Sequence, residues 1–217
     1  MKNKTKIVLY GGTGLSKMLR ETIEYSGAQV IAVVDDTPNL KQPLKNIPLF
    51  YTWDNFKSSD LYKDVSHFML AIGNPGCGKK PALFQKLVDA GLNPYTVFHY
   101  TSFVADDACV GAGSHVDIHA VVMAQAVIGK GAIIGPNSNV AHDVIIGDFV
   151  DLTVGVTICG HTVVGDNVLF GACSVVLPRL KIGNNVTIGA GAVVTKDVPD
   201  HITVVGIPAR EYIKNDR

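Results

Sequence analysis

From about residue 98 onward, the sequence repeats with a period of six residues. Every sixth residue from Val104 to Val194 is apolar, which gives 16 apolar positions in one register. Because 47% of the chain is apolar, chance would produce this series on the order of once in 10^5 trials. The period is therefore a property of the fold. The repeating positions are Val104, Val110, Val116, Val122, Ile128, Ile134, Val140, Ile146, Leu152, Ile158, Val164, Phe170, Val176, Ile182, Ile188 and Val194.

A period of six fits neither an α-helix, which repeats every 3.6 residues, nor a simple strand, which alternates every two. Glycine often follows the repeating residue, as at Gly111 and Gly165, and a small or aliphatic residue stands four places after it, as at Ala120 and Val144. Short strands joined by tight turns fit this pattern, because one side chain per strand then points into a narrow interior. The sequence predicts a parallel β-helix of hexapeptides.

The first hundred residues follow a different pattern. Three apolar runs, at residues 6–10, 29–36 and 67–74, alternate with helical segments at residues 15–26 and 80–90. A strand, a glycine turn, a helix and a strand that ends in acidic residues form a Rossmann-like α/β unit. The unit is small, so we expect it to hold one mononucleotide.

The length of 217 residues suits two such domains. We divide the chain into a Rossmann-like domain at residues 1–97 and a β-helix domain at residues 98–217. Lysine plus arginine equals aspartate plus glutamate, at 19 each, so neither nucleic acid nor an anionic membrane is an expected partner. The apolar run near the start is too short for a secretory signal or a membrane span.

The cysteines indicate a reducing compartment. None of them forms a CxxC pair, and a chain of this size needs no disulfide to fold. We therefore expect reduced cysteines in a cytoplasmic protein and no structural zinc. The four residues are Cys77, Cys109, Cys159 and Cys173.

The first glycine turn is a candidate phosphate site. Gly12, Thr13 and Gly14 come between a strand and a helix, where backbone N–H groups can face a phosphate. Lys17 replaces the third glycine of the GxGxxG pattern, so the motif is incomplete. An ordinary strand-to-helix turn is the other interpretation.

Polar residues also end the second and third predicted strands. Asp35 and Asp36 stand where an acid commonly meets a ribose hydroxyl or a base edge. Gly73 and Asn74 end the next strand and could line the same nucleotide pocket. The following residues nearly match a P-loop, but Lys80 stands where that motif needs a hydroxyl for magnesium, which argues against an NTPase.

The stretch NVAHDVIIGDFVDL, residues 139–152, contains the candidate catalytic pair. Val140 is a repeating inward residue, so His142 and Asp143 fall at a corner of the coil and face outward. A histidine there can act as a general base, and a neighbouring carboxylate can orient it. A pair of solvated surface residues is the alternative reading.

The pattern [LIV]-G-x-x-[STAV]-x resembles the left-handed β-helix of the hexapeptide-repeat acyltransferases. In that family three hexapeptides form a triangular coil of about 18 residues, so residues 104–194 imply roughly five coils. Gly160 then lies one coil from His142, about 4.8 Å along the stack. Its N–H is placed to polarise a thioester carbonyl.

One branch of this family shares four features with the chain: YGG-x-G, DD, AIGN and a β-helix with a His-acid pair. The resemblance to this branch covers nearly the whole chain. The chain is similar to the bacterial nucleotide-sugar N-acetyltransferases of the bacillosamine type and to the related sialic acid O-acetyltransferases. The resemblance implies direct acetyl transfer from acetyl-CoA to the C4 amine of a nucleotide-linked 4-amino-4,6-dideoxy sugar. It makes His142 the base, tuned by Asp143, within a homotrimer that serves a surface polysaccharide or glycoprotein.

The resemblance also implies binding residues. The nucleotide sugar would contact positions Thr13, Gly14, Asp35, Asp36 and Gly73. Acetyl-CoA would run between neighbouring β-helices, near Asp151, Gly160, Ala172 and Ala190. Two positions depart from the bacillosamine type: Asp143 replaces a glutamate and Asp151 replaces a histidine.

Three other functions remain open. An O-acetyltransferase would use the same base on a sugar hydroxyl. A zinc enzyme of the γ-carbonic anhydrase kind would need converging histidines, but it would leave the nucleotide domain unexplained, and we expect no metal. A non-catalytic sensor would bind nucleotide sugars without releasing CoA. The candidate zinc ligands are His115, His119, His142 and His161.

Overall fold

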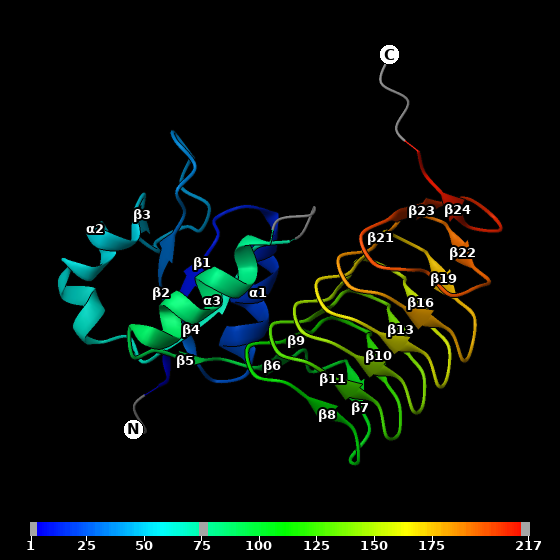
Figure 1. Cartoon of the computed structure of the whole chain (residues 1–217). Coiled ribbons are helices and arrows are strands. Elements are labelled where there is room, and N and C mark those ends of the chain that lie inside the picture. The colour runs from blue at the N-terminus through cyan, green and yellow to red at the C-terminus, as the bar shows by residue number, and fades with distance from the viewer. Residues whose placement is uncertain (1–3, 74–77, 214–217) are drawn as a thin grey trace. The chain divides into compact units, whose positions relative to one another are not determined.

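The computed structural model describes residues 4–73 and 78–213. The chain forms two compact units that divide between Tyr100 and Thr101. The first unit contains the α-helices, and the second is a stack of short strands wound into coils (Figure 1). No helix in the described part of the chain is long and apolar enough to cross a membrane.

The first unit is built on a five-stranded parallel sheet in the order β3-β2-β1-β4-β5. In β1, residues 7–10 are buried without interruption, which shows that both faces of the sheet are covered, as in other all-parallel sheets. The strands are β1 (Lys6–Tyr10), β2 (Gln29–Val34), β3 (Leu49–Phe50), β4 (His67–Leu70) and β5 (Asn93–Pro94), followed by β6 (Val97–Phe98). The helices are α1 (Gly14–Tyr25), α2 (Trp53–Lys57), the 3-10 helix η1 (Asp60–Lys63) and α3 (Lys79–Asp89).

The carboxyl ends of β1, β2 and β4 meet at one edge of this sheet, because the three strands are parallel neighbours. The Gly11 N–H donates to the Val34 carbonyl at 2.8 Å, and the Ala71 N–H donates to the Tyr10 carbonyl at 2.7 Å. Gly11 has φ of 112°, and a Cβ there would lie 2.4 Å from the Ala71 carbonyl oxygen. Only glycine permits this approach, so the three chain segments converge closely.

The second unit is a parallel β-helix of three sheets. Most coils contribute one two-residue strand to each sheet, and partners such as Val122 and Val140 are 18 residues apart. The hexapeptide coil and the Rossmann-like unit predicted from the sequence are therefore confirmed.

One sheet contains β7 (Phe103–Val104), β10 (Val121–Val122), β13 (Asn139–Val140), β16 (Thr157–Ile158), β19 (Val175–Val176) and β22 (Val193–Val194). The second contains β8 (Cys109–Val110), β11 (Val127–Ile128), β14 (Ile145–Ile146), β17 (Val163–Val164) and β20 (Lys181–Ile182). The third includes β9 (His115–Val116), β12 (Ile133–Ile134), β15 (Asp151–Leu152), β18 (Leu169–Phe170), β21 (Thr187–Ile188), β23 (Thr203–Val205) and β24 (Arg210–Glu211).

The repeating apolar residues fill the interior of the β-helix. All of them from Val116 to Val194 are buried, whereas Val104 and Val110, in the first coil, are partly buried. The six-residue period therefore comes from one inward side chain per strand, as the sequence predicts.

The corners of the coil require a left-handed backbone. Asn137, Asp143, His161 and Asn167 have φ between 54° and 59°. Short polar side chains tolerate this region better than most residues do. This left-handed backbone conformation sets the direction of the Cα–Cβ bonds of Asp143 and His161.

Candidate active site

The candidate base lies at a corner of the β-helix. The chain leaves β13 after Val140, which is fully buried, and enters β14 at Ile145. Between them, His142 and Asp143 face outward, with 54% and 36% of their side chains exposed. The corner of the coil that follows Val140 thus brings both polar side chains to solvent, as expected.

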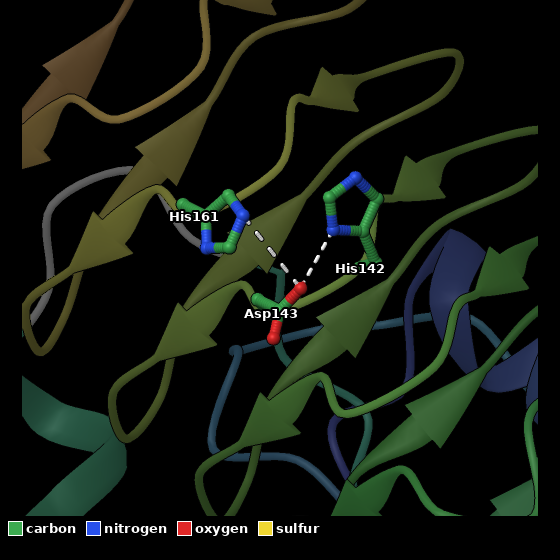
Figure 2. Close-up of side chains that lie close together, drawn as sticks. All are labelled: His142, Asp143 and His161. Carbon is green, nitrogen blue, oxygen red and sulfur yellow. Dashed lines mark hydrogen bonds and ion pairs between the residues drawn. The ribbon is translucent and has the colours of Figure 1, made fainter.

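His142 and Asp143 form a direct hydrogen bond. His142 Nδ1 lies 2.7 Å from Asp143 Oδ2 (Figure 2). A carboxylate can only accept, so in the neutral imidazole Nδ1 carries the proton and Nε2 keeps its lone pair. Nε2 points away from Asp143 (Figure 2), which leaves it available to accept a proton from a substrate.

Gly160 lies directly beside the His142 ring. A Cβ built on Gly160 would be 2.8 Å from Cε1 and 2.9 Å from Nε2 of His142. Real Cβ atoms essentially never come this close, so any larger residue at this position would displace the imidazole. The one-coil offset of 18 residues therefore places a glycine backbone against the basic nitrogen.

His161 is the third side chain at this corner. Its Nε2 lies 3.8 Å from Asp143 Oδ2, and its ring packs edge-on to that of His142 with centroids 5.2 Å apart. The His161 N–H also donates to the His142 carbonyl at 3.2 Å. Sequence reasoning considered His161 only as a zinc ligand and missed its place beside the pair, although residue 161 is one coil after Asp143.

The four histidines of the zinc alternative do not converge within one chain. Among the described residues, the one group that could hold a metal ion consists of His142, Asp143 and His161. His115 is buried on another face, in β9, and His119 lies at a different corner.

A cavity of about 420 Å³ opens at the edge of the first unit's sheet. It contains four of the predicted substrate residues, and Gly12 and Gly14 line an adjoining cavity that shares Thr13. The predicted residue Asn74 lies outside the described residues. The cavity is lined by Tyr10, Gly11, Thr13, Asp35, Asp36, Thr37, Ala71, Ile72, Gly73 and Lys79.

The two aspartates at this edge differ. Asp35 is 8% exposed, and its carboxylate accepts from the Gly12 N–H at 2.5 Å and the Thr37 N–H at 2.8 Å. Burial raises the pKa of Asp35, but hydrogen bonds from Thr37 and Gly12 outweigh it and hold the pKa below the usual 3.8. Asp35 therefore holds the glycine turn in place. Asp36 is exposed.

Asp36 has a partner that the sequence analysis did not identify. The Tyr10 hydroxyl donates to Asp36 Oδ2 at 2.7 Å. Burial, and then this bond, raise the pKa of Tyr10, so its hydroxyl stays protonated. The hydrogen bond orients the Asp36 carboxylate at the cavity wall.

The residues predicted to contact CoA lie at two different corners. Gly160 follows β16, whereas Ala172 follows β18 and lies one coil below Ala190, whose neighbour Gly191 donates to the Ala172 carbonyl at 2.8 Å. Asp151, in β15, is only 2% exposed. One chain does not bring these four positions together.

Comparisons with known proteins agree with this architecture. Residues 6–80 match the PglD N-terminal domain, and residues 161–196 match the bacterial transferase hexapeptide. No curated protein matches the chain in sequence. The chain has a Rossmann-like N-terminal domain and hexapeptide repeats wound into a left-handed β-helix, and it is an acyltransferase.

Its structural neighbours include nucleotide-sugar N-acetyltransferases. A histidine-to-asparagine variant of perosamine N-acetyltransferase from Caulobacter crescentus, in complex with CoA and GDP-perosamine, is 27% identical with a TM-score of 0.89, over 96% of this chain and 97% of that one. The acetyltransferase domain of PglB from Neisseria gonorrhoeae FA1090, in complex with acetyl coenzyme A, is 25% identical with a TM-score of 0.85, over 97% and 100%. WeeI from Acinetobacter baumannii AYE is 27% identical with a TM-score of 0.82, over 96% and 100%.

Proposed function

We propose that this chain transfers the acetyl group of acetyl-CoA to the C4 amine of a nucleotide-linked 4-amino-4,6-dideoxy sugar. The observation that carries the proposal is the corner at His142. Asp143 holds Nδ1 at 2.7 Å, and the free Nε2 lies against the backbone of Gly160. An oriented base is what acyl transfer to an amine needs, and we assign stabilisation of the oxyanion to the backbone N–H of Gly160 at this corner.

The reaction proceeds in two stages. The sugar amine attacks the thioester carbonyl carbon while His142 Nε2 accepts a proton from the nitrogen, and the Gly160 N–H stabilises the oxyanion. The tetrahedral intermediate then collapses, the C–S bond breaks, and the proton returns from His142 to the sulfur of CoA. The products are the N-acetylated sugar and free CoA, so no acyl-enzyme is required.

The cavity in the first unit would bind the nucleotide. Asp36, oriented by Tyr10, can accept hydrogen bonds from a base edge or a ribose. The turn at Thr13, held by Asp35, begins α1, where unpaired N–H groups favour phosphate. The GDP-perosamine bound to the Caulobacter crescentus enzyme supports a nucleotide-linked amino sugar as the ligand.

Acetyl-CoA would bind between two copies of the chain, in a homotrimer. The predicted contacts Gly160, Ala172 and Ala190 belong to two corners, so a second β-helix is needed to form one groove. The face that follows the His142 corner carries an exposed aliphatic stripe. Its members are Val127, Ile145 and Val163, which are 45%, 49% and 40% exposed. A stripe of this kind marks an interaction surface.

The test is release of CoA thiol from acetyl-CoA, measured across nucleotide-linked 4-amino sugars and the matching 4-hydroxy sugars with UDP, dTDP and GDP. We expect release with one 4-amino sugar and none with its hydroxyl counterpart. Release with the hydroxyl acceptor alone would contradict the proposal in favour of O-acetylation. Binding of the sugar without any release would indicate a sensor.

The role of His142 has its own test. We expect His142→Ala to lower kcat by about 10^2- to 10^4-fold, which is the usual contribution of a general base. The KM for acetyl-CoA should change little, because the imidazole acts on the amine. A variant that keeps near-normal kcat would remove His142 from the mechanism.

A further inference from the structure

The corner at His142 gathers three side chains that commonly bind transition metals. One ligand atom from each of His142, Asp143 and His161 lies within 4.8 Å of the other two. Asp143 lies between the two imidazoles and faces a nitrogen of each (Figure 2). Acetyl transfer uses only the first two residues, so the position of His161 needs another explanation.

The spacing of these atoms is close to that of a zinc site. Zn²⁺ binds imidazole nitrogen and carboxylate oxygen at about 2.0–2.2 Å in a tetrahedron, which separates the ligand atoms by about 3.3 Å. The distance from Asp143 Oδ2 is 2.7 Å to His142 Nδ1 and 3.8 Å to His161 Nε2, so the two values bracket the ideal one. All three ligand atoms lie within 4.8 Å of one another, so rotation of these partly exposed side chains would bring them to the spacing that the metal requires.

The backbone already holds the three residues in place. Asp143 and His161 sit at corners with φ of 57° and 59°. The His161 N–H donates to the His142 carbonyl at 3.2 Å, which ties the two coils together. Because the backbone is fixed in this way, binding a metal has to order only the three side chains.

We propose that His142, Asp143 and His161 form an inhibitory Zn²⁺ site. The metal takes the lone pair of His142 Nδ1, and the proton of the neutral imidazole then resides on Nε2. A protonated Nε2 cannot accept a proton from the substrate amine. Zinc therefore blocks the base by changing its tautomer and leaves the substrate sites open.

The ligand chemistry predicts which metals act. Two imidazoles and one carboxylate suit Zn²⁺ and Co²⁺. Mg²⁺ and Ca²⁺ prefer all-oxygen ligands, so they should bind weakly here and leave the enzyme active.

Binding is tested on the full chain without substrates, by calorimetric titration with Zn²⁺ and by the visible spectrum of Co²⁺. We expect one ion per chain.

His161→Asn removes a ligand while keeping a residue that tolerates the corner backbone, and it should weaken binding by at least the 10- to 100-fold that loss of an outer-shell partner costs. His119→Asn is the matched control, because His119 is an exposed corner histidine outside the cluster. Equal affinity in wild type and His161→Asn would overturn the site.

Inhibition is tested separately and rests on the proposed function. Zn²⁺ should lower kcat at unchanged KM, and a chelator should restore it. Relative to its own rate without metal, His161→Asn should resist zinc, whereas His119→Asn should remain sensitive. Equal zinc sensitivity of both variants, or a rise in KM alone, would contradict the proposed mode of inhibition. If no acceptor is acetylated at all, the proposed function fails, while the titration still decides whether the site exists.

Discussion

At the scale of single residues, the candidate site depends on how one exposed imidazole is held. More than half of the His142 side chain is exposed, and a side chain of this kind ordinarily exchanges between rotamers. Asp143 fixes one edge of the ring, and the absence of a side chain at Gly160 leaves room for the other. The orientation of the His142 ring is therefore set by its two neighbours.

Gly160→Ala tests this dependence. The new methyl group would overlap Cε1 and Nε2 of His142, so the ring must move, and a misplacement of about 1 Å can cost on the order of 10^2-fold in rate. The φ of Gly160 is not in the left-handed region, so we expect the free energy of unfolding to change by less than about 1 kcal/mol. Steady-state kinetics and urea denaturation measure the two effects.

The control for this substitution is the same change in a His142→Ala background. With the imidazole gone, the added methyl group has nothing to displace, and the two changes should not be additive. A further large loss of rate in the double variant would show that Gly160 acts by another route.

Asp35 gives a prediction about pH. Its pKa is lowered in the folded chain, so its carboxylate stabilises the fold above its unfolded value near 3.8, and this contribution is lost as the pH falls through the folded value. We expect Asp35→Asn to lower the free energy of unfolding at pH 7 by about 1.5–3 kcal/mol, the range for hydrogen bonds to a charged group. The difference between wild type and variant should shrink below about pH 4.

Urea denaturation followed by the fluorescence of Trp53, the chain's single tryptophan, measures this in the first unit. Asp36→Asn is the matched control, because Asp36 is exposed and accepts a single hydrogen bond from Tyr10. A pH-independent difference for Asp35→Asn would show that the charge is not responsible.

At the scale of structural elements, the two side chains of the short strand β20 have opposite environments. In β20, Ile182 is 3% exposed and packs in the core, whereas Lys181 faces solvent. Each strand is too short to be stable alone, so the coil depends on the stacked interior and on its neighbours.

We therefore expect the two residues of β20 to differ sharply on truncation. Ile182→Ala should cost about 2–5 kcal/mol, through lost burial and the cavity it leaves. Lys181→Ala should stay within about 0.5 kcal/mol. Denaturation monitored by circular dichroism would compare them, and similar losses for both would contradict the inward and outward assignment.

At the scale of the whole molecule, the aliphatic stripe borders the corner that carries His142 and Asp143. Ile145 comes two residues after Asp143 and is 49% exposed. If a second copy of the chain covers the stripe, then oligomerisation and activity depend on the same surface. A substitution that disrupts this surface should then abolish both.

Ile145→Glu tests this coupling. A carboxylate in the middle of an apolar interface would be buried without a partner, so we expect a lower oligomeric state and loss of acetyl transfer with unchanged circular dichroism. Sedimentation equilibrium measures the mass. Lys181→Glu, on the same face but already polar, should keep both properties, and an Ile145→Glu trimer with full activity would rule out the stripe as the interface.

Much of this could be read from the sequence, for a specific reason. The period of six recurs in every coil, so it predicts the β-helix and the outward direction of His142, whereas the 18-residue step to Gly160 came from the resemblance to hexapeptide-repeat acyltransferases. The pattern does not predict the separate roles of Asp35 and Asp36. The Asp35 carboxylate accepts hydrogen bonds from the backbone N–H groups of Gly12 and Thr37, whereas the Asp36 carboxylate accepts one from the Tyr10 hydroxyl.

The sequence by itself determined the architecture, because the β-helix depends on local repetition and the first unit on uninterrupted apolar strands. Only the tertiary structure decided which groups touch. The distance from His161 to Asp143 depends on rotamers at two stacked corners, and the roles of the two aspartates depend on which backbone N–H groups converge at the sheet edge. These contacts join residues far apart in the chain through side-chain torsions, which no periodic pattern specifies.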